Sequence, residues 1–293
     1  MRGLRRERGG VRLGEGARPT VGAGDVRLEV VCVGVCRTDV YVAEGRIPVD
    51  EPRVLGHEVC GVVRESRAEA WSPGEAVCVM PALERDVFLG VDRDGAFAEE
   101  LVVPGRALHR ARGLSMRHAA YAEPMAASMA VLGIGLPANG RGRILGGGRI
   151  ATLTRRVLAQ AGFSDVGALD EGDADLDFVI ETRATAETLT RAIAALRPGG
   201  TLVLKSRPYA PVPFDVAAAV QREIRIATAR YAPMDDAIAR LEERPSLVDD
   251  LLGPVLPLAE YDRAFGSRED VKTFLTPASA AEEIWARALE GAG

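Results

Sequence analysis

Three separated segments of the chain carry residues that could ligate a metal ion. Cys36 lies in GVCRTDVY, His57 and Glu58 are adjacent in GHEVC, and Glu123 lies in YAEPMA. A catalytic zinc takes three protein ligands of mixed nitrogen, sulfur and oxygen type and keeps one position open for substrate or water. Cys36, His57 and one or both of the glutamates meet that requirement. Together they predict one catalytic zinc ion.

Such a zinc ion would act as a Lewis acid on an alcohol or carbonyl oxygen, lowering the pKa of the alcohol so that its hydride can leave. Thr38 follows Cys36 by two residues, and its hydroxyl could take the alcohol proton and pass it outward. Each residue alone has a simpler interpretation. A cysteine in VVCVGVC is more often a small buried hydrophobe, and Glu123 before a proline could simply begin a helix. Only the combination favours zinc.

A second set of residues has the features of a dinucleotide-binding loop. In ILGGGRIA, Gly146, Gly148 and Ala151 follow the spacing G-x-G-x-x-A between a predicted strand and a predicted helix. The glycines would let the backbone approach a pyrophosphate, and the helix N-terminus would present free N–H groups to it. Arg149 and Ile150 are counted with this loop. A plain glycine turn is the alternative interpretation.

Asp170 ends the next predicted strand, DVGALD. A carboxylate there could hold the ribose hydroxyls of adenosine, which favours NAD slightly over NADP. The surrounding LDEGD is acidic throughout, so a solvated turn is the alternative. The predicted cofactors are one zinc ion and NAD or NADP.

The elements that must position these residues change in character along the chain. Short β-branched runs at 25–35, 58–63, 75–80 and 96–103 lie between glycine and proline turns, which predicts a small antiparallel barrel. From Tyr121 onward, an alanine- and methionine-rich helix is expected to lead into a second domain.

Beyond Gly142 the pattern alternates between strand and helix, which predicts right-handed βαβ units on a parallel sheet. The predicted strands are 143–147, 165–170, 176–181, 201–206 and 224–229, and the predicted helices are 149–162, 185–200, 216–223 and 234–243. Residues 255–265 and 271–277 are expected to return to the first domain, and 278–292 to form a terminal helix.

Composition excludes several classes of protein. A net charge of −5 with 47% hydrophobic residues gives no case for nucleic acid or an anionic membrane as partner. No apolar run is long enough to span a bilayer, and the basic N-terminal segment lacks the apolar core of an export signal. The four cysteines suggest ligands or core packing more than disulfides. We expect a cytoplasmic protein.

These motifs resemble the zinc-containing medium-chain dehydrogenase/reductase family, the group of alcohol and sorbitol dehydrogenases. The matching segments include VGVCRTDVYVAEGRIP, VLGHEVCGVV, AEPMAASMAVL and ILGGGRIA, in family order. The resemblance implies an α/β protein with a GroES-like β-barrel catalytic domain at 1–126 and 255–293. It also implies a truncated Rossmann domain, a doubly wound parallel sheet, at 127–254, with the active site in the cleft between the two.

The resemblance also implies roles for single residues. Cys36, His57 and Glu123 would ligate zinc, and Glu58 would be the nearby carboxylate that can ligate or release the metal during turnover. Asp39 would not ligate the zinc itself but would support the residues that do.

Three further positions follow from the same resemblance. Thr38 corresponds to the proton-relay hydroxyl, and Arg37 to a position that can contact the cofactor pyrophosphate. Tyr41 occupies a position where some relatives carry a histidine of the proton relay, so a proton relay in this protein would use a different side chain there.

The chain departs from the family pattern in three places. In one, ETRAT replaces the family's usual threonine-glycine, which would put Arg183 near the nicotinamide side. The segment ALERDVFLGVDR has no cysteine where the family's structural-zinc lobe would lie, so no second zinc is expected. Only residues 149–176 separate Gly148 from Asp177, where a full Rossmann half would hold another strand and more helix. The absent part normally borders the adenine.

The leading hypothesis is a zinc-dependent alcohol dehydrogenase/reductase, acting between a secondary alcohol, such as a polyol or sugar-like metabolite, or its ketone, and NAD(P). The alternative is a non-redox zinc lyase or isomerase, or an enzyme that recycles a held nicotinamide, acting on a carbonyl substrate. A non-enzymatic interaction module is a third interpretation, which the complete ligand set argues against. A homodimer or homotetramer is expected from the family.

Overall fold

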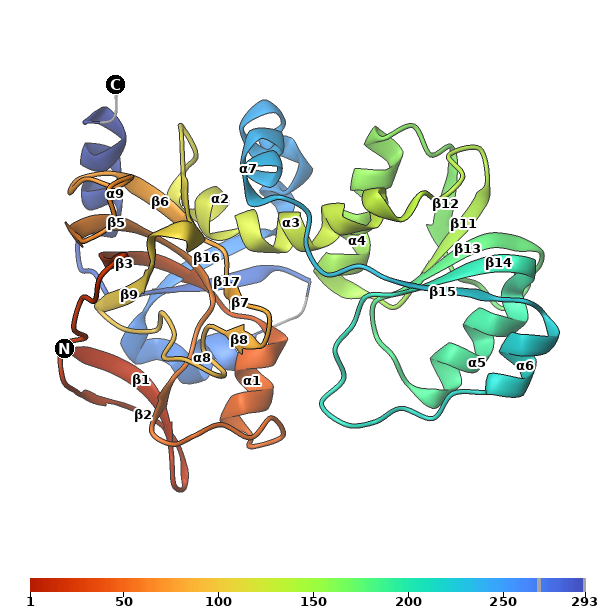
Figure 1. The fold of residues 1–293 in the computed structure, drawn as a ribbon, viewed down its shortest axis with the longest axis horizontal. Helices are drawn as coiled ribbons and strands as arrows, with labels where there is room; N and C mark the ends of the chain where they lie inside the picture. Colours follow the sequence, from red (N-terminus) through yellow and green to blue (C-terminus); the bar gives the residue numbers. More distant parts are fainter. Residues whose placement is uncertain (268–269, 292–293) are drawn as a thin grey trace. The chain divides into compact units, whose positions relative to one another are not determined.

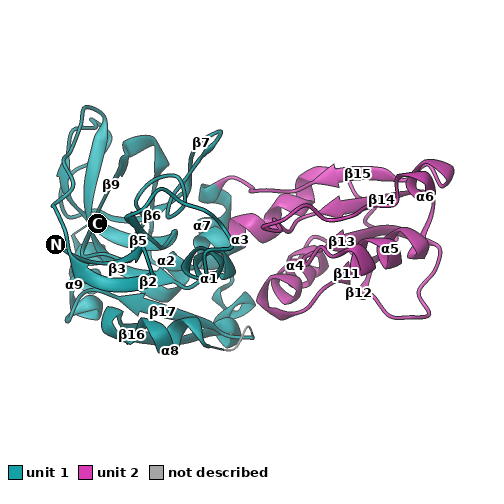
Figure 2. Ribbon diagram, turned by 90° about the horizontal axis from the view of Figure 1, so that it is seen from below, with its two compact units in different colours: residues 1–124, 234–293 teal, residues 125–233 magenta. Residues whose placement is uncertain are grey.

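In a computed structural model of the protein, residues 1–267 and 270–291 are described. Contacts between residues divide the chain into two units, as Figure 2 shows in two colours. Unit 1 comprises Met1–Pro124 and Met234–Gly293, and unit 2 comprises Met125–Pro233. Residues 234–254, which were predicted to belong to the Rossmann domain, fall in unit 1 by this division. The predicted domain boundaries stay a prediction. The last predicted helical residue, 292, lies outside the described residues.

Unit 1 is built on a sheet in which β3 is the central strand and every pair is antiparallel except β16–β17. The strand order is β10-β6-β5-β3-β17-β16, with β9 also paired to β3, and smaller sheets β2-β1-β4 and β7-β8 lie beside it. Its elements before α3 (Ala122–Met129) are β1 (Arg2–Glu7), β2 (Gly10–Glu15), β3 (Asp25–Gly34), α1 (Arg37–Ala43), β4 (Arg53–Val54), β5 (Glu58–Ser66), β6 (Ala76–Val79), β7 (Ala82–Glu84), β8 (Val87–Phe88), β9 (Glu100–Pro104), β10 (Leu108–Arg110) and α2 (Met116–Ala120). Its later elements are α7 (Met234–Glu243), β16 (Leu252–Pro257), α8 (Tyr261–Phe265), β17 (Lys272–Thr276) and α9 (Ala281–Glu290).

The core of unit 1 consists of the β-branched and leucine side chains that marked these strands in the sequence. Leu28, Val63, Phe97 and Leu275 are fully buried in one cluster. Burial of such side chains contributes about 1.5–3 kcal/mol each. The GroES-like barrel predicted for this part of the chain is confirmed.

Two features of unit 1 differ from the predicted pattern. Residues 2–15 form the β1–β2 hairpin, whose turn contains Gly9 with a φ of +94°. The predicted strand 96–103 begins only at Glu100, because the segment before it bonds elsewhere. The Leu4 amide donates to the Phe97 carbonyl (2.7 Å), and the Phe97 amide donates to the Leu55 carbonyl (2.8 Å).

Unit 2 is a parallel sheet with helices on both faces (Figure 1). The strand order is β12-β11-β13-β14-β15, and every neighbouring pair is parallel. Its elements are β11 (Arg141–Leu145), α4 (Gly148–Gln160), β12 (Asp165–Ala168), β13 (Leu176–Glu181), α5 (Ala186–Ala195), β14 (Leu196–Leu204), α6 (Val216–Gln221) and β15 (Arg225–Thr228). The predicted doubly wound α/β architecture is confirmed.

The two faces of this sheet have separate cores. Ile144 and Phe178 pack with Leu158 of α4 on one face. Leu145 and Val179 pack with residues of α5 and α6 on the other. Since successive strand residues point to opposite faces, this alternation places Arg143 on the face of α5 and α6.

The shortening of the Rossmann domain is visible between β12 and β13. Residues 169–175 alone connect these two strands, and they contain a turn but no helix. Strand β11 lies between β12 and β13 in the sheet. The connection must therefore return along the whole length of β11 to start β13 in parallel.

Candidate functional site

The donors from the first two predicted metal-ligand segments meet at one end of the β3–β5 pair. Cys36 follows β3 and is the N-cap residue of α1. His57 precedes β5 and Glu58 is its first residue. Antiparallel pairing sets Gly34 of β3 opposite Glu58. The short turn from Gly34 to Cys36 therefore brings the sulfur to the same end of the sheet.

The side chains of Cys36, His57 and Glu58 offer one ligand atom each, and these atoms all lie within 4.8 Å of one another. His57 is 1% exposed and Glu58 2% exposed, whereas Cys36 is only half buried. His57 Nδ1 and Glu58 Oε2 are buried, and each is in ion-pair contact with a neighbouring side chain, Asp39 and Lys272 respectively. Nitrogen, sulfur and oxygen donors this close together are the kind of set that zinc requires. The residues present fit a zinc ion.

The buried carboxylate of Asp39 links the two segments that carry these donors. Its Oδ2 accepts a hydrogen bond from the Cys36 amide (2.8 Å), and its Oδ1 accepts one from the Gly56 amide (3.1 Å). Oδ1 also lies 3.3 Å from His57 Nδ1. A carboxylate beside a ligating histidine fixes the ring orientation and raises its basicity. Asp39 is placed to do this.

The environment of His57 changes its affinity for protons. Burial lowers the pKa of the imidazole, but the Asp39 carboxylate and the Cys36 sulfur raise it more strongly, so the pKa lies well above 6.5. The Asp39 carboxylate beside the ring therefore favours positive charge in this pocket.

Glu58 has a buried cationic partner from the far end of the chain. Lys272 Nζ lies 2.6 Å from Glu58 Oε1 and 2.5 Å from Oε2, and it also donates to the Val35 carbonyl (3.0 Å). A Cβ at Gly34 would lie 2.3 Å from Glu58 Oε2 and 3.2 Å from Lys272 Cδ. Only glycine at position 34 leaves room for this ion pair.

Sequence reasoning missed Lys272 and Gly34. The signal for the lysine was its rarity, because Lys205 and Lys272 are the only lysines and Lys272 lies in an otherwise uncharged strand. Neither residue could be paired with Glu58 without the register of β3, β5 and β17.

The other predicted residues of unit 1 occupy distinct positions. The Thr38 hydroxyl lies 3.9 Å from Cys36 Sγ in the first turn of α1, and Arg37 begins that helix. Tyr41 lies one turn further, with Arg46 over its ring. Glu123 is buried at the start of α3 and is not among the residues whose ligand atoms lie within 4.8 Å of one another. The roles assigned to these residues stay predictions.

The remaining three cysteines form a buried row across the sheet of unit 1. Cys32 lies opposite Cys60, and Cys60 lies opposite Cys78. All three thiols are free and fully buried, and burial raises their pKa values. Protonated, buried thiols act as small hydrophobes, so Cys36 stands apart as the half-buried cysteine beside a histidine.

In unit 2 the glycine loop follows directly from the end of β11. Gly146 has a φ of +116°, and a Cβ there would lie 2.3 Å from Thr182 Oγ1. Thr182 in turn donates through its amide (2.9 Å) and its hydroxyl (3.1 Å) to the Leu145 carbonyl. Helix α4 begins at Gly148 and runs for 13 residues. Its N-terminal N–H groups form the kind of site that holds a phosphate.

Asp170 lies at the same edge of the sheet. The Leu169 amide donates to the Ile144 carbonyl (3.0 Å), which continues the β12 register by one residue. Asp170 therefore comes level with the start of the glycine loop. Within residues 1–267 and 270–291, its carboxylate has no hydrogen-bond or ion-pair partner, and the side chain is exposed. A free carboxylate at this edge fits a ribose diol.

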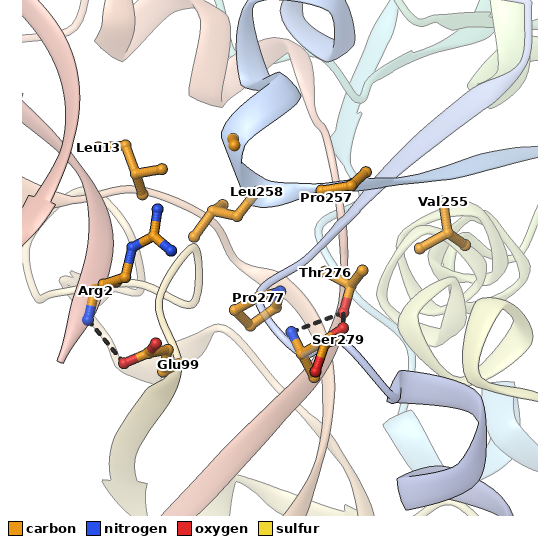
Figure 3. Close-up of a pocket in the computed structure, with 11 residues that line it drawn as sticks. Arg2, Leu13, Glu99, Val255, Pro257, Leu258, Thr276, Pro277 and Ser279 are labelled. Atoms are coloured by element: carbon orange, nitrogen blue, oxygen red, sulfur yellow. Dashed lines mark hydrogen bonds between the residues drawn. The ribbon is translucent and has the colours of Figure 1, made fainter.

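A separate hollow of about 510 Å³ lies elsewhere in unit 1. Figure 3 shows it between Arg2, Leu258 and Thr276, and its lining includes none of the metal-ligand candidates. It is not part of the candidate site. Over the described part of the chain, no helix combines the length and apolar character needed to cross a membrane.

Known proteins resemble the chain in both sequence and fold. The alcohol dehydrogenase GroES-like domain matches residues 22–113. A Rhizobium meliloti protein, provisionally named a D-xylulose reductase, is 31% identical over 85% of this chain and 90% of its own length. A sorbitol dehydrogenase of Halalkalibacterium halodurans is 24% identical over 90% of this chain and 94% of its own. A Sinorhizobium meliloti structure, provisionally named a zinc-binding dehydrogenase and solved with NADP, superposes with a TM-score of 0.83. It is 24% identical and covers 94% of this chain and 99% of its own.

Replacing Asp39 by asparagine should weaken zinc binding about 10- to 100-fold, because the amide cannot offer a full negative charge to His57. Competition with a chromophoric chelator measures this affinity. Asp94→Asn is the matched control, since Asp94 also accepts a backbone hydrogen bond, from the Val54 amide at 2.9 Å, but lies outside the donor group. Equal zinc affinity in the Asp39 and Asp94 variants would contradict the role given to Asp39.

Replacing Lys272 by methionine should lower the free energy of unfolding of the zinc-free protein by about 3–5 kcal/mol, because Glu58 would keep a buried charge without a partner. Urea denaturation in the presence of a chelator measures the loss. The double variant Lys272→Met/Glu58→Gln should recover much of it. A single variant as stable as the wild type would show that the ion pair does not hold this region together.

Proposed function

The chain belongs to the zinc-dependent medium-chain dehydrogenase/reductase family, and we propose that it interconverts a secondary alcohol and its ketone with NAD(P). The substrate class we favour is a polyol or sugar-like metabolite. The relatives named for D-xylulose and sorbitol act on molecules of that class by their names, which supports this choice.

The observation that carries the proposal is the donor group of Cys36, His57 and Glu58. Cys36 lies 21 residues before His57 in the sequence, yet the ligand atoms of all three residues lie within 4.8 Å of one another. A purely structural role would not require a half-buried thiol beside a histidine and an acid. Cys36 is half buried, so solvent reaches the donor group from its side.

In this proposal Cys36 and His57 hold zinc, with Glu58 and Glu123 as the oxygen donors. Bound zinc supplies Lewis-acid polarisation of the substrate oxygen, and bound NAD(P) supplies the hydride acceptor or donor. Thr38 takes the hydroxyl proton of the alcohol and passes it outward, with Tyr41 further along α1. Lys272 offsets the charge of Glu58 when that carboxylate is not needed as a ligand.

The nucleotide belongs to unit 2 in this proposal. Gly146, Gly148, Arg149 and Ile150, at the start of α4, would hold the pyrophosphate. Asp170 accepts hydrogen bonds from the ribose hydroxyls. A carboxylate there repels a 2′-phosphate, so we infer a preference for NAD over NADP.

The relatives and structures reported above are named as dehydrogenases or reductases, so the non-redox alternative has no support among them. We also infer a cytoplasmic location, which the four free cysteines support, since disulfides are rare in that compartment.

We further infer a homodimer that forms through strand β15. This strand ends the sheet of unit 2 and, among the described strands, pairs only with β14. Ile226 is 49% exposed on it, and Val216 and Val220 of the preceding helix are 64% and 70% exposed. An edge strand with exposed apolar side chains pairs readily with another chain. A second copy would cover both the edge and these side chains.

Replacing Cys36 by alanine should remove zinc and abolish turnover, because only two of the close donors remain. Metal content by atomic spectroscopy and absorbance at the nicotinamide band, with a panel of polyols and ketoses, measure both. Cys78→Ala, a buried cysteine away from the donors, should keep both properties. Full activity in the Cys36 variant would contradict the proposal. Consumption of the substrate by the wild type without any change in nicotinamide absorbance would point to non-redox chemistry.

Replacing Ile226 by aspartate should convert the dimer to a monomer of 31.2 kDa in light scattering after size exclusion. The new charge would be buried against the second copy, which costs several kcal/mol. Leu132→Asp, which changes another exposed apolar side chain of unit 2 at 37% exposure, should remain dimeric. Identical masses for the two variants would exclude β15 as the interface.

A further inference from the structure

The connection between β12 and β13 is unusually short for its topology. Two parallel strands of one sheet are normally joined through a dozen or more residues, usually with a helix. Here residues 169–175 make the whole crossover past β11. Asp175, at its end, has a φ of +55°, a left-handed conformation that aspartate tolerates better than most residues. Such a connection needs side chains to hold it on the sheet.

Arg143 of β11 is the side chain that holds it. Its Nε lies 3.0 Å and 3.2 Å from the two carboxylate oxygens of Asp173, in the middle of the crossover. Its Nη1 donates to Asp165 Oδ1 (2.8 Å) on β12 and to the Gly142 carbonyl (2.7 Å). Arg143 and Asp173 are mostly buried, at 16% and 10% side-chain exposure. The planar guanidinium thus joins three neighbouring segments.

The same network extends to the candidate ribose-binding acid. Asp173 Oδ2 accepts a hydrogen bond from the Asp170 amide (2.8 Å), and the Asp173 amide donates to the Asp170 carbonyl (3.3 Å). Both backbone groups of Asp170 are therefore used to fix its position. Its carboxylate alone is left without a partner among the described residues.

Charge gives Arg143 a second effect on this segment. The stretch from β12 to β13 carries a run of acids, namely Asp165, Asp170, Glu171, Asp173 and Asp175. Without a neighbouring cation, the mutual repulsion of these carboxylates would push the residues of the turn apart. Arg143 neutralises two of these carboxylates by direct contact, and Arg141 Nη1 donates to the Ala174 carbonyl (3.2 Å). The turn stays closed, and the Asp170 carboxylate remains free at the sheet edge.

We propose that Arg143 and Asp173 are positioning residues that hold the Asp170 carboxylate in place for the adenosine ribose, and thereby set the preference for NAD. This inference rests on the proposed function, because it assigns a nucleotide to unit 2. The pair replaces the support that the absent strand and helix would have given to this end of the sheet. It touches neither the reacting atoms nor the zinc donors.

The test is equilibrium binding of NADH and NADPH to the zinc-loaded full chain, followed by nucleotide fluorescence, for a set of variants. Arg143→Met and Asp170→Asn should each weaken NADH about tenfold, the scale of one lost hydrogen bond to a charged group. NADPH binding should change much less, so the preference for NADH falls. The double variant should bind NADH no more weakly than Asp170→Asn alone, because Arg143 acts through Asp170.

Two further variants separate positioning from loss of fold. Arg197→Met removes a comparable ion pair, in which Arg197 Nε lies 2.8 Å from Asp177 Oδ1 at the opposite end of the same sheet. This variant should leave NADH binding unchanged. Arg143→Lys keeps the charge but lacks the fork that reaches both Asp165 and Asp173. It should melt like the wild type in circular dichroism and bind NADH with intermediate affinity.

Unweakened NADH binding in Arg143→Met, or in a normally melting Arg143→Lys, overturns this inference alone. Additive losses in the double variant with Asp170→Asn also overturn it, since they would mean that Arg143 acts elsewhere. A wild-type protein that binds neither nucleotide overturns the proposed cofactor and this inference with it. The two failures are therefore distinguishable.

Discussion

The buried carboxylate of Asp39 is the constraint on which the candidate metal site depends. It accepts hydrogen bonds from the amides of Cys36 and Gly56 and lies against His57. These amides belong to the start of α1, just after β3, and to the turn before β5, so Asp39 joins the segments that flank the paired ends of the two strands. One negative group therefore aligns a sulfur donor with a nitrogen donor and supplies the charge that a cation in the pocket would neutralise.

A second buried charge, on Glu58, is compensated from β17. Lys272 neutralises Glu58 in a place with almost no solvent, and Gly34 leaves the space that the pair fills. A buried ion pair of this kind adds little stability in itself, but removing one partner is costly. Lys272 therefore provides a cationic partner for the Glu58 carboxylate inside the donor group. The same sheet buries the other three thiols, which leaves Cys36 as the accessible sulfur.

Unit 2 shows how a Rossmann-type sheet can lose a strand and keep its nucleotide edge. The glycine loop, the start of α4 and the end of β12 meet at the carboxyl ends of the strands, where ligands bind in open α/β sheets. The crossover between β12 and β13 contains no helix and is held by arginines of β11. Leu169 adds an apolar contact with the core on that face of the sheet.

The sequence by itself determined the element types and the candidate donors. Periodicity and turn residues predicted β3, β5, α4 and β13 closely, but residues 196–200 of the predicted helix 185–200 lie in β14. The motifs around Cys36, His57, Gly146 and Asp170 were readable because each is local. The hairpin β1–β2, the Glu58–Lys272 pair and the Arg143–Asp173 anchor were decided by the tertiary structure. Local patterns follow from backbone geometry within a few residues. The pairing of distant buried charges depends on strand register, and only the folded sheet sets which residues lie opposite one another.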